Sequence, residues 1–478
     1  MAPEALPTFT TSDATTGVPA FDHDCGEPLP AFGSDFRWGT ATAAYQIEGA
    51  ADSDGRGPSI WDTFSHQPGR IREGHTGDVA CDHYHRWEED LTLAAGLGLD
   101  SYRFSIAWSR VQPDGQSAVN PAGLNFYDRL VDRMLELGLS PFPTLFHWDL
   151  PQALEDRGGW LNRDTAYRFA DYAALVADRL GDRVPQWITL NEPFIHMAFG
   201  YALGVHAPGH ELYFGALPAG HHQLLGHGLA AAALAERGGA VLLTNNCTPV
   251  TPASDQPEDL AAAAVYDTLH NRFFLDPVLT GRYPELLEEM LTASGTIHDG
   301  DLKTIAAPLD GLGINYYTPT LVSAPPAGSE DSAPPLPFLQ LPIDGVPHTG
   351  FGWPVVPSGL RDLLVGLRDR YGADLPPIYV TENGCAYPDP VEDDGQVRDQ
   401  ERIAFLDAHV RAVREAITAG VDVRGYFVWS LLDNFEWAEG YTQRFGLVHV
   451  DFETQVRTPK ASYHWYAEQV RAQRAGTR

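Results

Sequence analysis

Residues 187–193 read Trp187-Ile188-Thr189-Leu190-Asn191-Glu192-Pro193, and residues 378–384 read Ile378-Tyr379-Val380-Thr381-Glu382-Asn383-Gly384. Each segment is a short, β-rich apolar run of the kind that is buried in a parallel sheet. Each run ends in a carboxylate that stands beside an asparagine and a chain breaker. The pattern therefore predicts that Glu192 and Glu382 lie at the carboxyl ends of two different strands.

Strand-like runs of this kind recur along the chain. The candidates are Phe36 to Ala41, Ser101 to Ser105, Ser140 to Phe146, Gln186 to Leu190, Ala240 to Thr244, Gly311 to Asn315, Pro377 to Thr381 and Gly425 to Trp429. Helical patterns separate them, for example from Leu124 to Leu137 before Gly138 and from Glu401 to Ala419 before Gly420. Alternating strands and helices predict an α/β fold, a single (β/α)8 TIM barrel with elaborated βα loops at the C-terminal face.

In such a barrel Glu192 follows the fourth strand and Glu382 the seventh, so the two carboxylates can face one substrate across the barrel mouth. Cleavage of the acetal between two sugars uses such a pair. One carboxylic acid protonates the leaving oxygen, and one carboxylate stabilises or attacks the anomeric carbon.

The chain of 478 residues contains no linker that would divide it into separate domains. We expect a flexible N-terminal extension over residues 1–30, which lack apolar periodicity, and one catalytic barrel over residues 31–470. The Pro-rich stretch from Ala324 to Pro347 is interpreted as a long βα loop that walls the substrate cleft, because strand-like runs follow it.

The charge balance is strongly acidic, with Asp+Glu 64, Lys+Arg 32 and a formal net charge of −32. Such a surface repels nucleic acid and anionic membranes, so neither is expected as a partner. The sequence shows neither a basic segment followed by an apolar core nor a membrane-spanning apolar run, which favours the cytoplasm. The four cysteines are scattered without CxxC spacing, which is typical of reduced thiols.

The two glutamate motifs resemble the paired catalytic segments of family 1 glycoside hydrolases, the retaining β-glucosidase family. The resemblance runs from about Phe36 to about Trp465. Further motifs carry it in order along the chain: Phe36-Arg37-Trp38-Gly39-Thr40-Ala41-Thr42-Ala43-Ala44-Tyr45-Gln46-Ile47-Glu48-Gly49, Tyr102-Arg103-Phe104-Ser105, Phe146-His147-Trp148-Asp149-Leu150-Pro151, Asn315-Tyr316-Tyr317 and Trp429-Ser430-Leu431-Leu432-Asp433-Asn434-Phe435-Glu436-Trp437.

The resemblance implies a role for each of these strand ends. Glu192 would be the acid/base and Glu382 the nucleophile, and Arg103, Asn315 and Tyr317 would orient Glu382. The residues that would contact the substrate are Gln46, His147, Trp148, Asn191, Trp353, Trp429, Glu436, Trp437 and Phe445. Among these, Trp429 would form the floor under the nonreducing sugar and Trp353 the platform under the leaving sugar. The resemblance implies neither a cofactor nor a metal.

Two positions bear on the substrate. Relatives that act on phosphorylated sugars typically carry a small polar residue in place of Glu436 and a lysine soon after it, because phosphate repels a carboxylate and needs a cation. This chain has Glu436 and, later, Gln443, which predicts an unphosphorylated β-glycoside or oligosaccharide. Phe194 stands where relatives often have tryptophan, so the shape of the leaving-group subsite is left open.

The environments implied by the resemblance predict a mechanism. Arg103 should lower the pKa of Glu382 and keep it ionised, whereas Glu192, near that charge and partly desolvated, should stay protonated. The expected result is hydrolysis with retention of configuration, with the two carboxyl groups about 5 to 5.5 Å apart.

Several alternatives stay open from the sequence. Asp82, His83 and His85 have donor types that suit a metal, although helical spacing points the two histidines away from each other. A noncatalytic sugar-binding barrel would keep the sugar ligands but lose at least one carboxylate. The preference among glucosides, galactosides and fucosides and the oligomeric state, a homo-oligomer included, are not decided by the sequence.

Overall fold

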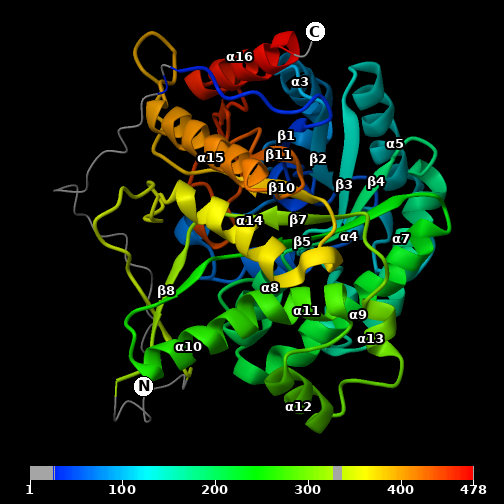
Figure 1. Ribbon diagram of the computed structural model, residues 1–478. Helices are drawn as coiled ribbons and strands as arrows, with labels where there is room; N and C mark the ends of the chain where they lie inside the picture. Colours follow the sequence, from blue (N-terminus) through cyan, green and yellow to red (C-terminus); the bar gives the residue numbers. More distant parts are fainter. Residues whose placement is uncertain (1–24, 26, 327–335, 477–478) are drawn as a thin grey trace.

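The computed structural model of the protein describes residue 25 and residues 27–326 and 336–476. Parallel strands form a closed barrel at its centre, in the order β1-β11-β10-β7-β5-β4-β3-β2 (Figure 1). The barrel strands are β1 (Arg37–Ala41), β2 (Ser101–Ser105), β3 (Ser140–Phe146), β4 (Gln186–Asn191), β5 (Ala240–Asn246), β7 (Gly311–Asn315), β10 (Ile378–Asn383) and β11 (Val423–Trp429). The predicted (β/α)8 barrel is confirmed.

The largest differences from the predicted bounds at the barrel mouth are in β5 and β10. β10 extends to Asn383 instead of ending at Thr381. The reason is that Glu382 pairs with Asn315 of β7 and Asn383 pairs with Val428 of β11, so the ladder continues through the polar residues. Glu382 therefore lies inside its strand, whereas Glu192 follows the end of β4 as predicted.

Apolar side chains fill the interior of the barrel below this mouth. They form one buried cluster with a side chain from each of β3, β4, β5, β10 and β11: Phe142, Ile188, Leu242, Tyr379 and Phe427. Such a layer makes the barrel interior a packed core and leaves no pore. The side chains available for chemistry are therefore those at the C-terminal ends of the strands.

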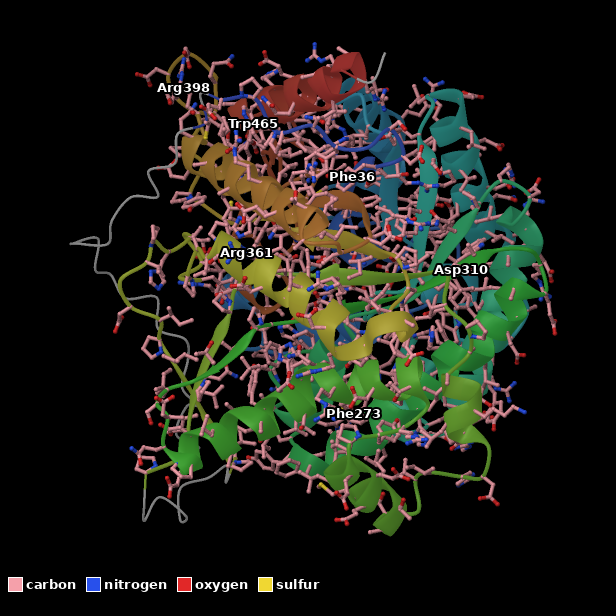
Figure 2. The ribbon with its side chains drawn as sticks, in the orientation of Figure 1. Phe36, Phe273, Asp310, Arg361, Arg398 and Trp465 are labelled. Carbon is pink, nitrogen blue, oxygen red and sulfur yellow. The ribbon has the colours of Figure 1, made fainter. Side chains whose placement is uncertain are left out.

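An outer ring of helices covers the barrel, with α5 and α7 on one side and α14 and α15 on the other (Figure 1). The main outer helices are α3 (His83–Gly96), α5 (Pro121–Glu136), α7 (Asp164–Leu180), α9 (Leu217–Ala235), α11 (Phe273–Thr280), α14 (Pro357–Tyr371), α15 (Gln400–Thr418) and α16 (Ala461–Gly476). Helix α5 begins earlier than predicted because Pro121 suits the first turn of a helix. Phe273 of α11, labelled in Figure 2, is fully buried.

The remaining elements lie in the connections. They are α1 (Ala44–Ile47), α2 (Ile60–Ser65), η1 (Arg72–Gly74), α4 (Trp108–Val111), α6 (Gln152–Glu155), η2 (Gly159–Leu161), α8 (Pro193–Ile195), η3 (His196–Ala202), η4 (Tyr213–Ala216), β6 (Val250–Pro252), α10 (Pro257–Asp267), η5 (Thr268–Arg272), α12 (Glu285–Ala293), α13 (Asp301–Ile305), β8 (Thr320–Ser323), β9 (Leu339–Leu341), η6 (Gly372–Asp374), η7 (Trp437–Glu439), β12 (Val448–Val450) and β13 (Arg457–Pro459). Strands β6, β8 and β9 form a small sheet beside α10.

Most of the predicted N-terminal extension, residues 1–24 and 26, lies outside the described residues. Arg411 of α15 donates to the backbone oxygen of Glu27 (2.6 Å), and the side chain of Leu29 is buried. Residues 327–335, which belong to the predicted βα loop, also lie outside the described residues. None of the helices in the described ranges is long and apolar enough to cross a membrane.

Candidate active site

Glu192 and Glu382 reach the barrel mouth from different strands. Glu192 joins β4 to α8 in a left-handed backbone conformation (φ 46°), and its N–H donates to Thr244 of β5. A left-handed conformation is unusual for a residue with a side chain, and it turns the chain sharply into α8, which begins with Pro193. Both glutamates are buried.

A cation and a phenol hold Glu382. Arg103 of β2 donates from Nη1 to Glu382 Oε1 (2.5 Å), and Tyr317, which follows β7, donates its hydroxyl to Oε2 (2.7 Å). Arg103 is itself almost fully buried and also donates from Nη2 to Asn191 Oδ1 (2.6 Å). One guanidinium therefore connects Glu382 to the strand end that carries Glu192.

Asparagine amides hold Glu192. Asn315 donates from Nδ2 to Glu192 Oε1 (2.7 Å) and to Asn191 Oδ1 (3.1 Å). Asn315 was expected to orient Glu382; its amide contacts Glu192 in addition, and the expected role at Glu382 stays a prediction. Thr381 donates its hydroxyl to Asn315 Oδ1 (2.7 Å), which turns the NH2 group toward Glu192. Asn315 still lies close enough to lower the pKa of Glu382 as well.

The pKa values of the two carboxyl groups are both raised. Burial raises the pKa of Glu382, and Arg103 and Tyr317 oppose that rise without cancelling it. The predicted lowering of this pKa is therefore wrong, because removal from water outweighs the cation. Burial also raises the pKa of Glu192, and the negative charge of Glu382 raises it further.

Polar side chains beside the carboxylates have unused hydrogen-bonding atoms. Gln46 donates to the backbone oxygen of Phe435 (2.9 Å), and His147 Nε2 accepts from Asn191 Nδ2 (3.0 Å). Gln46 Oε1 and His147 Nδ1 are buried and have no hydrogen-bond partner among the described residues. Buried polar atoms normally have partners, so these atoms are suited to bind the hydroxyls of a ligand.

Glu436 is a third buried carboxyl in the same region. Gln46 Nε2 lies 3.4 Å from its Oε2. Burial, together with the charges of Glu382 and Glu439, raises the pKa of Glu436 to about 8. Unlike Glu382, Glu436 forms no ion pair with a cation in the described part of the chain, and its raised pKa favours the protonated form at neutral pH.

Tryptophans pack behind these polar groups. Trp437 lies between Trp61 (ring centroids 4.5 Å apart) and Trp148 (4.6 Å), and Trp429 stacks on His147 (5.8 Å). Trp148 donates its indole N–H to the backbone oxygen of Asn191 (2.8 Å). Because the indole has one donor, Trp148 positions Asn191 and is not available to donate to a sugar hydroxyl.

A second aromatic group lies beside Glu382. Trp353 contacts Tyr317 (5.2 Å), Phe445 (5.9 Å) and Phe351 (4.4 Å), and these rings pack with Trp429. Sequence reasoning did not single out Phe351. Its position two residues before Trp353 could have indicated that it belongs to the same aromatic group.

Phe194, singled out in the sequence, has two neighbours on the Glu192 side that the sequence did not reveal, His270 and Asn246. The ring of Phe194 packs against His270 of η5 in a tilted arrangement with centroids 4.0 Å apart, and His270 Nε2 lies 2.9 Å from Asn246 Oδ1 at the end of β5. Asn246 in turn hydrogen-bonds to the Glu192 side chain. His270 follows a helix far along the chain, and no local pattern marks it as part of a site.

The residues of the alternative metal site do not converge. His83 Nδ1 lies 2.8 Å from Asp90 Oδ2 and is buried, whereas His85 Nδ1 lies 2.6 Å from Asp82 Oδ1 at the surface. Across residue 25 and the ranges 27–326 and 336–476, no three His, Cys, Asp or Glu side chains are grouped as metal ligands.

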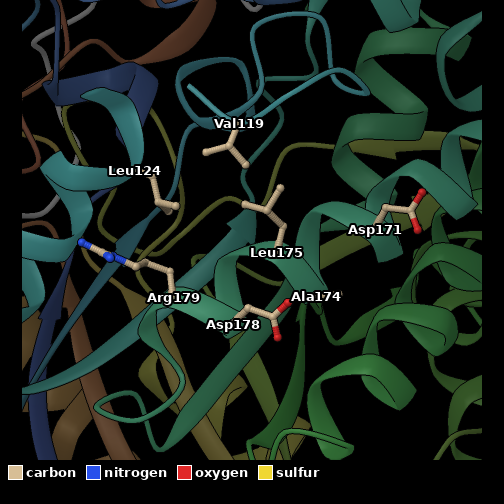
Figure 3. Close-up of a pocket in the computed structure, with 7 residues that line it drawn as sticks. All are labelled: Val119, Leu124, Asp171, Ala174, Leu175, Asp178 and Arg179. Atoms are coloured by element: carbon tan, nitrogen blue, oxygen red, sulfur yellow. The ribbon is translucent and has the colours of Figure 1, made fainter. Parts of the chain in front are cut away.

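A surface hollow between α5 and α7 also lacks the features of an active site (Figure 3). It is lined by Val119, Leu124, Asp171, Ala174, Leu175, Asp178 and Arg179. Arg179 pairs with Asp128 (2.6 Å) and Asp178 with Arg237 (2.6 Å), so these charges are engaged with neighbouring helices. The hollow lies on the outer helices, away from the strand ends.

Comparisons with known proteins agree with this geometry. The model of the family described as Glycosyl hydrolase family 1 matches residues 30–475. Thermostable beta-glucosidase B of Thermobispora bispora is 50% identical over 446 residues, covering 92% of this chain and 90% of the relative. The bifunctional beta-D-glucosidase/beta-D-fucosidase of Bifidobacterium breve is 48% identical, covering 91% and 97%. The crystal structure of the psychrophilic beta-glucosidase BglU from Micrococcus antarcticus superposes with a TM-score of 0.89 at 50% identity, covering 93% of this chain and 98% of that one.

Proposed function

This chain belongs to glycosyl hydrolase family 1 and is a glycoside hydrolase of the β-glucosidase type, and from that premise we propose that Glu382 and Glu192 hydrolyse β-glucosides with retention of configuration. The observation that carries the proposal is the difference between the two buried carboxyls. Glu382 has a guanidinium on one oxygen and a phenol on the other, whereas Glu192 has amide partners only. The first environment suits an anion and the second an acid.

In the first step, Glu382 attacks the anomeric carbon and forms a glycosyl ester. The bond to the leaving oxygen breaks as Glu192 gives that oxygen its proton. In the second step, the Glu192 carboxylate takes a proton from water, the water oxygen bonds to the anomeric carbon, and the ester to Glu382 breaks. Two inversions give net retention, and both glutamates return to their starting states.

The proposed substrate is an unphosphorylated β-D-glucoside, including β-linked disaccharides such as cellobiose and aryl or alkyl glucosides. Glu436, Gln46 and His147 would receive the sugar hydroxyls, because each is buried and the latter two carry unpartnered polar atoms. β-Fucosides are a second candidate, since the Bifidobacterium breve relative is named a glucosidase and fucosidase. The rings of Trp353 and Phe351 would receive the leaving group.

Azide rescue tests the role of Glu382. The Glu382→Gly variant should lose hydrolysis, and azide should restore turnover by entering the space left by the carboxylate and attacking from the same face. With an activated β-glucoside, the product should be the α-glucosyl azide, identified by NMR.

The same reagent gives the opposite product if Glu192 is the acid/base. Glu192→Ala should still form the glycosyl-enzyme from substrates with good leaving groups and then stall, because no base activates water. Azide should then attack the ester and release the β-azide. Exchanged anomers would reverse the two roles, and no rescue in either variant would favour the noncatalytic sugar-binding barrel.

The cytoplasmic location, the flexible extension and a homo-oligomer stay predictions. Cell fractionation, limited proteolysis and analytical ultracentrifugation of the full chain would test them in turn.

A further inference from the structure

We propose that His270 is a positioning residue for Glu192, which it controls through the side-chain amide of Asn246. The inference rests on the proposed acid/base role of Glu192. It concerns residues of β5, α10 and η5, which carry none of the roles assigned above. Its basis is a pair of hydrogen bonds, from Tyr266 to His270 and from His270 to Asn246, together with the effect of the Asn246 side chain in lowering the pKa of Glu192.

A donor and an acceptor can be assigned to each hydrogen bond between Tyr266, His270 and Asn246. Tyr266 of α10 lies with Oη 3.2 Å from His270 Nδ1, and His270 Nε2 lies 2.9 Å from Asn246 Oδ1. Because Asn246 Oδ1 accepts from the imidazole, its NH2 group is the part of the side chain left to act as a donor, and the Asn246 side chain lowers the pKa of Glu192. His270 thereby decides which end of the Asn246 amide faces the carboxyl.

The ring of His270 is fixed in one protonation state. Burial lowers the pKa of His270 to about 3, which favours the neutral imidazole at pH values well above 3. A neutral imidazole has one donor and one acceptor nitrogen. With the Tyr266 hydroxyl donating to Nδ1, the ring proton sits on Nε2 and is donated to Asn246.

A second contact ties His270 to the backbone that presents Glu192. The ring of Phe194, in the short helix that begins directly after Glu192, stacks on His270 with centroids 4.0 Å apart and an interplanar angle of 31°. His270 lies within the π-helical turn η5, and the π-helical turn η3 directly follows α8, which carries Phe194; such turns occur frequently at functional sites. The stack and the hydrogen bond both hold the ring against the Glu192 side of the mouth.

Other groups also act on the proton of Glu192. Glu382 on β10 raises the pKa of Glu192, and Arg103 on β2 lowers it. On the outer side, the charged group facing His270 is Asp267 of α10. Asn315 and Asn246 add neutral N–H donors that favour the ionised carboxyl. Loss of the Asn246 donor should therefore leave Glu192 a weaker acid.

The decisive variant is His270→Phe, which keeps a ring for the stack on Phe194 and removes both hydrogen bonds. The basic limb of the kcat/KM profile should move to higher pH. The loss of kcat/KM should be about 10-fold on alkyl glucosides, because their leaving alcohol needs a proton. It should be small on 2,4-dinitrophenyl glucoside, whose leaving group departs as a stable anion. Equal losses on both substrates with an unmoved basic limb would overturn the inference.

Matched variants guard against a general loss of folding. Tyr266→Phe removes only the outer hydroxyl and should move the basic limb in the same direction by less, with an unchanged circular dichroism spectrum. His270→Gln can still donate to Asn246 and should recover part of the alkyl glucoside activity. If Tyr266→Phe and His270→Gln both behave as His270→Phe does on the two substrates, a merely structural role is indicated and the inference fails.

A double-mutant cycle separates this inference from the proposed function. In the Glu192→Ala background, His270→Phe should cause no further loss on alkyl glucosides, because the group it acts through is gone. An independent further loss would overturn the relay while leaving the role of Glu192 intact. If Glu192→Ala alone loses the same factor on both substrates, the acid/base assignment fails and the inference fails with it.

Discussion

Glu192 and Glu382 are similarly buried at the barrel mouth, but the side chains that contact them differ in charge. Glu192 is 5% exposed and Glu382 3%, so burial alone cannot make one an acid and the other a nucleophile. The Glu382 side supplies the guanidinium of Arg103 and the phenol of Tyr317, whereas the Glu192 side supplies the amides of Asn315 and Asn246. The comparison indicates that the charge of the partners, more than exposure to water, divides the two roles.

The two sides are also braced differently. Behind the Glu382 side, Lys460 is fully buried and donates to Asp389 (2.6 Å) and Asp433 (2.8 Å), which lie in the loops after β10 and β11. Arg402 adds contacts to Asp389 and to the backbone of Phe445. Behind the Glu192 side stand the neutral side chains of Tyr266, His270 and Asn246. Behind Glu382 the buried side chains form ion pairs, whereas the hydrogen-bonded series behind Glu192 consists of neutral side chains with Asp267 on its outer side.

The largest effect is expected from Arg103→Met, which removes the cation from the Glu382 side. Breaking a buried ion pair leaves an uncompensated charge and costs about 3 to 5 kcal/mol, so kcat/KM should fall on the order of 10³-fold. The loss should be similar for good and poor leaving groups, because the nucleophile acts on every substrate. Steady-state kinetics with aryl and alkyl glucosides measures this, and a loss below about 10-fold would contradict the comparison.

Glu436 extends the comparison to a carboxyl without a cation. Glu436→Ser should lower kcat/KM for β-glucosides by about 10²-fold, because it removes the hydrogen-bonding group for sugar hydroxyls. Glu436→Gln keeps the size and the neutral charge of the protonated form, so it should lose only about 10-fold. Equal losses in the two variants would show that a negative charge at Glu436 is required and that its proton leaves when sugar binds.

A smaller effect is expected from Tyr317→Phe. This change removes one hydrogen bond to Glu382 and keeps the aromatic ring that packs against Trp353. A hydrogen bond to a charged group contributes about 1.5 to 3 kcal/mol, so kcat/KM should fall by at least about 10-fold, equally on all leaving groups. Asn315→Ala is the matched change on the other side, and its loss should grow as the leaving group becomes poorer.

The sequence predicts the barrel and its two glutamates because both leave a pattern in consecutive residues of the chain. Each strand is a short apolar run, and Glu192 and Glu382 stand where such a run stops. The contact of Asn315 with Glu192 could not be predicted, since it depends on a hydrogen bond from Thr381 that orients the Asn315 amide. The raised pKa of Glu382 depends on its burial, and the relay through His270 depends on a helix that reaches the mouth from outside the motifs. These features arise from tertiary packing, so they cannot be predicted from a short sequence motif.

The smallest expected effect is a change in the pKa of Glu192 during the reaction cycle. Burial and the charge of Glu382 raise this pKa, so Glu192 holds its proton at pH values where an ordinary carboxyl is ionised, and activity should be lost as pH rises through the raised value. When Glu382 becomes an ester, its negative charge disappears while Arg103 remains. The pKa of Glu192 should then fall by at least about one pH unit, which converts the acid of the first step into the base of the second.

Carbon-13 NMR titration of the Glu192 carboxyl can measure this change, in the free enzyme and in an enzyme trapped as its 2-deoxy-2-fluoroglucosyl ester. Glu382→Gln serves as the control, because it removes the same charge without a bound sugar and should lower the pKa in the same direction. A pKa that stays raised in both forms would mean that burial alone sets it. In that case the two sides of the mouth would not be coupled through the charge of Glu382, and Glu192 would need another cause to become a base.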